Sequence, residues 1–71
     1  MKIIILGAGL VGGPMAVDLV ANRDFEVTAV DRDAHALELL SAVHRSLNTI
    51  CRDLSDPKTV GELVHGFDLA I

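Results

Sequence analysis

Three glycines follow the first apolar run of the chain with the spacing G-x-G-x-x-G, at Gly7, Gly9 and Gly12. In such a loop the first glycine permits a tight turn out of a strand, the second lets a pyrophosphate approach the backbone, and the third lets a helix pack closely against the strand. The backbone N–H groups near Leu10 and Val11 would face the ligand at a helix N-terminus, where unpaired N–H groups and the helix dipole favour an anion. The spacing therefore predicts a loop that binds the phosphates of a dinucleotide.

An aspartate, Asp31, stands nineteen residues after Gly12, directly after the β-branched run "EVTAV". A carboxylate at the end of the second strand can accept hydrogen bonds from the ribose hydroxyls of adenosine, whereas it would repel a 2′-phosphate. Asp31 therefore favours NAD over NADP. Arg32 keeps NADP open as the cofactor, because a guanidinium beside the ribose can pair with a 2′-phosphate or lie flat on the adenine.

Asp53 follows a third apolar stretch, "NTIC", and two roles are open for it. Its carboxylate could accept a hydrogen bond from the adenine amino group, or it could cap a turn before the next helix. A purely structural interpretation also exists for the loop, in which the glycines permit a tight turn and Asp31 caps the next helix. The register of strand, loop, helix and acid favours a nucleotide site over that interpretation.

The other reactive side chains predict neither a catalytic pair nor a metal site. His35, His44 and His65 lack a spacing typical of metal ligands, and Cys51 is the single cysteine. We expect the histidines to face solvent or to cap helix ends, and Cys51 to be a small core residue.

The elements that must position these residues alternate along the chain. Strands are expected at residues 2–6, 26–30, 48–51 and 67–71, and helices at residues 10–22, 34–46 and 57–65, with Asp33 and Asp56 as N-caps. The order β-α-β-α-β-α-β predicts an α/β fold with a Rossmann-like parallel sheet, right-handed crossovers and the strand order 3-2-1-4. We expect residues 1–71 to form a single, partial dinucleotide-binding domain that is a fragment of a longer chain.

Composition and charge exclude several classes of protein. The chain has 71 residues, a formal net charge of -4 and six Lys and Arg residues, without the basic stripe that nucleic-acid binding needs. The apolar run "IIIL" is too short for a signal peptide or a membrane span. A single cysteine is typical of a reducing compartment. We therefore expect a cytoplasmic protein that binds neither nucleic acid nor a membrane.

With the glycine loop and both strand-end acids in place, the chain resembles the N-terminal NAD(P)-binding portion of the saccharopine dehydrogenase-like oxidoreductases. The matching segments are "IIILGAGLVGGPMAVDLV", "EVTAVDRD" and "CRDLSDPKTVGELVHGFDLAI". The resemblance implies hydride transfer between a nicotinamide cofactor and a carbon-nitrogen bond of an amino-acid-derived substrate, and it places Asp53 near the adenine. This segment would hold the adenosine and pyrophosphate half of the cofactor. Gly13 stands where relatives often carry a large or basic residue, and the family's nicotinamide-side loop and substrate domain are absent.

Two other functions remain open. One is a regulatory nucleotide sensor like the domains that gate potassium uptake channels, which would bind NAD, ATP or ADP without chemistry. The other is a half-domain that forms a homo-oligomer, because an uncovered strand edge or an exposed apolar helix face invites association.

Overall fold

The computed structural model describes residues 1–7 and 12–71, in which strands and helices alternate as the sequence predicts. The elements are β1 (Lys2–Leu6), α1 (Gly12–Val20), β2 (Glu26–Asp31), α2 (Ala34–Val43), β3 (Asn48–Cys51), α3 (Pro57–Val64) and β4 (Leu69–Ala70). None of the helices in these ranges is long and apolar enough to cross a bilayer.

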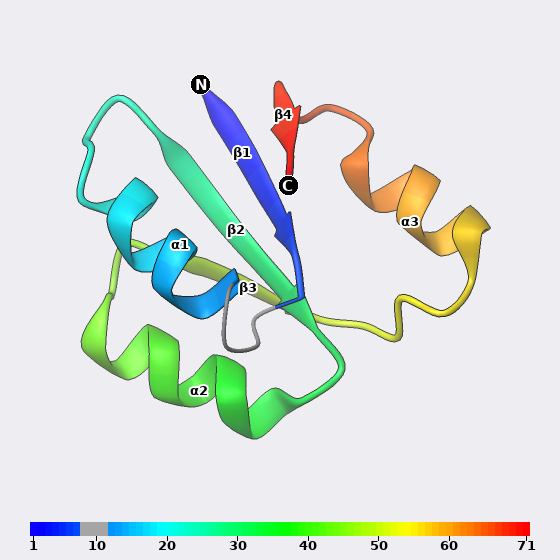
Figure 1. Ribbon diagram of the computed structural model, residues 1–71, viewed down its shortest axis with the longest axis horizontal. Coiled ribbons are helices and arrows are strands. Elements are labelled where there is room, and N and C mark those ends of the chain that lie inside the picture. Colours follow the sequence, from blue (N-terminus) through cyan, green and yellow to red (C-terminus); the bar gives the residue numbers. More distant parts are fainter. Residues whose placement is uncertain (8–11) are drawn as a thin grey trace.

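The strands form one parallel sheet in the order β3-β2-β1-β4, which confirms the predicted order and fold class. β1 and β2 are central and pair along their lengths, from Lys2 opposite Glu26 to Leu6 opposite Val30. β3 and β4 lie at the two edges. A right-handed return from β3 to β4 requires α3 to cross the face opposite α1 and α2. Figure 1 shows α3 apart from the other two helices, beyond β4.

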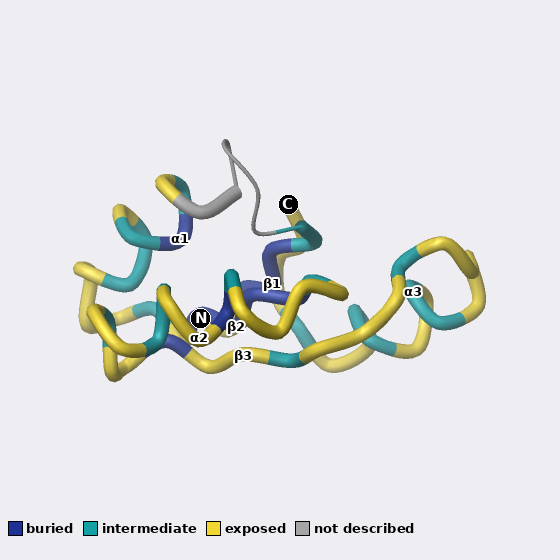
Figure 2. Tube along the Cα trace, turned by 90° about the horizontal axis from the view of Figure 1, so that it is seen from below, coloured by how far each residue is buried: buried dark blue, intermediate teal, exposed yellow. Residues whose placement is uncertain are grey.

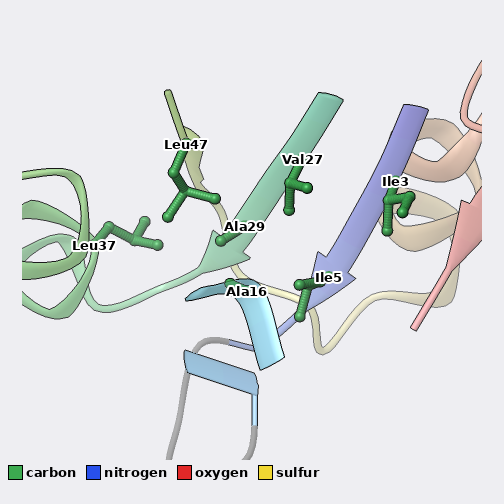
Figure 3. Packing of buried hydrophobic residues seen from close by; sticks show 7 residues of the cluster. All are labelled: Ile3, Ile5, Ala16, Val27, Ala29, Leu37 and Leu47. Atoms are coloured by element: carbon green, nitrogen blue, oxygen red, sulfur yellow. The ribbon is translucent and has the colours of Figure 1, made fainter. Parts of the chain in front are cut away.

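The central strands are buried on both faces, which explains why their sequences are continuous apolar runs. Ile3, Ile4 and Ile5 are each at most 1% exposed. Figure 2 shows this burial in β1 and β2, whereas β3 and α3 are largely exposed or half-buried. On the face that α1 and α2 cover, a core cluster forms from Ile3, Ile5, Ala16, Val27, Ala29, Leu37 and Leu47 (Figure 3).

Several elements are shorter than the sequence indicates. α2 ends at Val43, because the backbone of its C-cap residue His44 leaves the helical region, with φ -123° and ψ 84°. The His44 N–H still donates to the Leu40 carbonyl at 2.9 Å, and Leu47 N–H donates to the His44 carbonyl at 3.0 Å. β4 contains only Leu69 and Ala70. The expected start of the first helix at residue 10 lies outside the described residues.

Both predicted N-caps are confirmed. The Asp33 side chain accepts hydrogen bonds from His35 N–H at 3.1 Å and Ala36 N–H at 3.2 Å, and so begins α2. The Asp56 side chain accepts from Lys58 N–H at 3.0 Å, and Pro57 occupies the first position of α3. These caps begin both helices directly after the loops that follow β2 and β3, so the loops are short and their residues remain near the strand ends.

Candidate functional site

The candidate site lies at the carboxyl ends of β1, β2 and β3, the edge of a parallel α/β sheet where ligands bind. Gly7 leaves β1 with a φ of +98°, which L-residues rarely adopt, and its N–H donates to the Val30 carbonyl at 2.7 Å. The predicted tight turn therefore begins at the first glycine of the loop. The predicted phosphate-binding residues Gly9, Leu10 and Val11 lie outside the described residues, and Gly12 is the first residue of α1.

Asp31 is the last residue of β2 and lies opposite Cys51 of β3. Its backbone carbonyl accepts a hydrogen bond from Arg52 N–H at 2.9 Å, which ties the end of β2 to the end of β3. Its Oδ1 accepts from Asp33 N–H at 3.1 Å, so Asp31 also shapes the turn into α2. The N-cap of that helix is Asp33, however, and the structural interpretation of Asp31 as the cap is wrong.

An open pocket of about 280 Å³ lies at this edge. Pockets for drug-sized ligands usually measure about 300–1,000 Å³, so this one matches part of a dinucleotide better than a whole one. Its lining comes from two short segments that are distant in sequence, Asp31 and Arg32 after β2 and Asp53, Leu54 and Ser55 after β3. Three residues singled out in the sequence, Asp31, Arg32 and Asp53, are thus brought together.

Asp53 adopts the turn that was one of its two expected roles. Its Oδ1 accepts a hydrogen bond from Ser55 N–H at 2.9 Å. The backbone and the hydroxyl of Ser55 hold the pKa of the Asp53 carboxyl below its usual range, and the positive charge of Arg32 adds to this effect. Because Asp53 also lines the pocket, the turn is compatible with a ligand contact.

Two pocket residues, Leu54 and Ser55, were not singled out in the sequence. The signal that could have found Ser55 is the spacing Asp-x-Ser directly after a strand, since an aspartate often accepts a hydrogen bond from the backbone two residues later. No comparable local signal exists for Leu54, which becomes part of the site because it lies between Asp53 and Ser55.

Cys51 is exposed, and the prediction that it is a small core residue is wrong. It belongs to β3, which is an edge strand that α2 covers only in part. Its Sγ lies 3.5 Å from the Arg32 carbonyl, at a distance where the thiol can donate a weak hydrogen bond. The thiol therefore helps to hold the end of β2 against β3 beside the pocket.

Comparison with known proteins finds a matching family, a similar solved structure and a related sequence. The family model described as "Saccharopine dehydrogenase NADP binding domain" matches residues 3–71. Among solved structures, the apo histidine-tagged saccharopine dehydrogenase (L-Glu forming) from Saccharomyces cerevisiae matches with a TM-score of 0.80 and 26% identity, over 97% of this chain and 15% of that chain. The Trk system potassium uptake protein TrkA of Haemophilus influenzae is 42% identical over 60 residues, which are 84% of this chain and 13% of that protein. The chain thus spans only a small part of either relative.

Proposed function

Because the chain belongs to the saccharopine dehydrogenase NADP binding domain family, we propose that its strand-end pocket holds the adenosine end of the dinucleotide. The observation that carries this proposal is the meeting of Asp31, Arg32 and Asp53 in one pocket at the carboxyl edge of the sheet. In this assignment Asp31 accepts hydrogen bonds from the ribose and Asp53 accepts one from the adenine amino group. The glycine spacing assigns pyrophosphate binding to the segment from Gly7 to Gly12.

Family membership establishes a nicotinamide dinucleotide as the ligand, and the family description favours NADP. In the sequence, Asp31 favours NAD over NADP. Arg32 supports NADP as a ligand, since it lines the same pocket and a guanidinium can pair with a 2′-phosphate. We assign Arg32 the role of pairing with the 2′-phosphate. The negative charge of Asp31 repels that phosphate and so limits the preference of the pocket for NADP over NAD.

For the longer protein we propose hydride transfer between the cofactor and a carbon-nitrogen bond of an amino-acid-derived substrate. The support is the family and the likeness to a saccharopine dehydrogenase. The 71 residues would contribute cofactor binding as one part of a larger dinucleotide-binding domain, and catalytic residues would come from elsewhere. A dehydrogenase assay of a longer chain with NADP and saccharopine would test this assignment.

Calorimetric titration of the full chain with NADP, NAD and ATP in parallel tests the binding function. We expect both dinucleotides to bind, and Asp31→Ala to weaken NAD binding more than NADP binding. Asp24→Ala is the matched control, because this exposed carboxylate precedes β2 at the opposite edge of the sheet. A chain that binds neither dinucleotide would contradict the proposal.

A regulatory nucleotide sensor is the second candidate, and the 42% identity with a potassium uptake protein favours it. A sensor would bind a nucleotide without turning it over. Binding of ATP alone, without binding of either dinucleotide, in the same titration would select this function over the dehydrogenase.

We also propose a cytoplasmic location and self-association. The exposed free thiol of Cys51 supports the first, because unpaired cysteines are typical of reducing compartments. The exposed apolar side chains of Leu39 and Val43 on α2 support the second. Cell fractionation tests the location, and size-exclusion chromatography with light scattering tests the oligomeric state.

A further inference from the structure

The peptide group that joins Arg32 to Asp33, directly after β2, is held from both sides. Its carbonyl belongs to Arg32 and accepts a hydrogen bond from the Cys51 thiol, whose Sγ lies 3.5 Å from the oxygen. Its N–H belongs to Asp33 and donates to Asp31 Oδ1 at 3.1 Å. A thiol on β3 and a carboxylate on β2 are therefore connected through one peptide group.

The backbone places Cys51 where its thiol can reach this carbonyl. Cys51 lies opposite Asp31 in the register of β2 with β3, and Arg52 N–H donates to the Asp31 carbonyl at 2.9 Å. These contacts fix the ends of the two strands against each other. A planar peptide group can still rotate about the single bonds that flank it. The thiol and the carboxylate oppose that rotation, because they bind the two polar groups of the same plane.

The two hydrogen bonds also strengthen each other. A bond accepted at the carbonyl polarises the amide, and the N–H of that amide then becomes a better donor. Loss of the thiol would weaken the bond from Asp33 N–H to Asp31 Oδ1. The Asp31 carboxylate, which lines the pocket, would then sample more orientations. Cys51 is absent from the pocket lining, so it acts on the pocket through this peptide group.

We propose that Cys51 is a positioning residue that raises the affinity of the pocket for NAD relative to NADP by orienting Asp31. This inference rests on the proposed function, in which Asp31 accepts hydrogen bonds from the ribose. Those bonds are directional and depend on the orientation of the carboxylate. Pairing of Arg32 with a 2′-phosphate depends on it less, because the guanidinium ends a long side chain with several rotatable bonds. The thiol therefore acts chiefly on NAD binding.

Calorimetric titration of the full chain with NAD and NADP tests the proposal with three variants at position 51. Cys51→Ala and Cys51→Val both remove the donor, and valine retains side-chain bulk and suits a strand. Cys51→Ser keeps a hydroxyl donor. Thr49→Val is the matched control, because it removes a hydroxyl at an exposed position two residues earlier, on the same face of β3 and outside the pocket lining.

Amide NMR spectra provide a readout that a general loss of stability would not reproduce. In Cys51→Ala and Cys51→Val, the Asp33 N–H resonance should shift upfield, because its hydrogen bond to Asp31 weakens. The amide of Ile4, in the buried strand β1, should keep its chemical shift. Cys51→Ser should return the Asp33 resonance close to its original position.

We expect both variants without a donor to bind NAD about threefold more weakly, as for the loss of one weak hydrogen bond. Their affinity for NADP should remain close to that of the unchanged chain. Cys51→Ser should restore most of the NAD affinity, since the hydroxyl can donate to the Arg32 carbonyl. Thr49→Val should alter the affinity for neither dinucleotide.

Unaltered NAD binding in Cys51→Ala and Cys51→Val, or equal losses of NAD and NADP affinity, would overturn the inference while leaving the proposed function intact. A Cys51→Ser variant as weak as Cys51→Ala would also overturn it, because the donor would then be irrelevant. Failure of the unchanged chain to bind either dinucleotide would reject the proposed function and the inference together. If Cys51→Ala did not fold, the comparison of Cys51→Val with Cys51→Ser would still decide the outcome.

Discussion

Asp31 lies directly opposite Cys51 in the parallel pairing of β2 with β3, and Arg52 N–H donates to the Asp31 carbonyl at 2.9 Å. This register makes the two strands end at the same level. The residues that follow each strand, Arg32 on one side and Asp53 on the other, consequently face a common pocket. The pairing of the edge strand β3 with the central strand β2, rather than any single motif, creates the candidate site.

Asp31→Asn should shift the cofactor preference toward NADP. The substitution removes the negative charge that repels a 2′-phosphate and weakens the bond to the ribose, while an amide oxygen can still accept from Asp33 N–H. We expect NAD affinity to fall about tenfold, as for loss of a charged hydrogen bond. Calorimetric Kd values for NAD and NADP measure the change. Asp24→Asn, with the same charge change far from the pocket, should leave the ratio unaltered, and an equal response of both variants would contradict the assignment.

Arg32→Gln should weaken NADP binding about tenfold and NAD binding much less, because only NADP carries the phosphate that a guanidinium can pair with. The salt dependence of NADP binding should also decrease, since exposed charge interactions are screened by salt. Titrations at low and high salt measure both effects. Arg23→Gln, in the turn before β2, is the matched control. Identical losses of affinity for NAD and NADP in Arg32→Gln would show that Arg32 does not bind the 2′-phosphate.

Gly7→Ala should destabilise the fold by about 1–2 kcal/mol through the backbone alone, because an L-residue resists the left-handed region. Apart from its chain neighbours, no atom of the described residues lies within 4 Å of a Cβ built at Gly7, so a clash with those residues does not contribute. Gly61→Ala offers a contrast, since that position is equally open but helical, and alanine there should stabilise by roughly 1 kcal/mol. Urea unfolding gives both values, and a neutral Gly7→Ala would refute the strained turn.

Asp33→Ala should lower the free energy of unfolding by about 1 kcal/mol, because α2 loses the cap that accepts from His35 and Ala36 N–H. Asp33→Asn should lose much less, since asparagine caps helices nearly as well as aspartate. Thermal unfolding followed by circular dichroism measures the difference. Equal losses of unfolding free energy in Asp33→Ala and Asp33→Asn would indicate that the negative charge of Asp33, rather than its capping hydrogen bonds, stabilises α2.

Acid should remove a small stabilisation that Asp53 contributes. Its pKa is lowered in the folded chain, chiefly by the Ser55 backbone hydrogen bond and then by the Ser55 hydroxyl. A lowered carboxyl pKa stabilises the fold above the unfolded-state pKa of about 3.9, and the effect is lost as pH falls through the lower folded value. Thermal melts between neutral pH and about pH 2 should therefore show a shallower acid loss in Asp53→Asn than in the unchanged chain. Matching profiles would contradict the lowered pKa.

Local patterns in the sequence predicted the elements and much of the site. Continuous aliphatic runs such as "IIIL" indicated strands buried on both faces, and the strand-helix alternation led to the order 3-2-1-4. The spacing of Gly7, Gly12 and Asp31 pointed to the carboxyl edge of the sheet. These features depend on periodicity and turn chemistry, which are encoded within a few neighbouring residues.

The pairing of segments that are distant in sequence decided which further residues line the pocket and which residues are exposed. Ser55 became a pocket residue because the register of β3 against β2 brings its turn beside Asp31 and Arg32, and no local pattern specifies that register. Cys51 is exposed because β3 pairs, among the described strands, with β2 alone, although its apolar sequence context resembles that of a core strand. Burial and proximity follow from which strands become edges, and this is a property of the whole sheet.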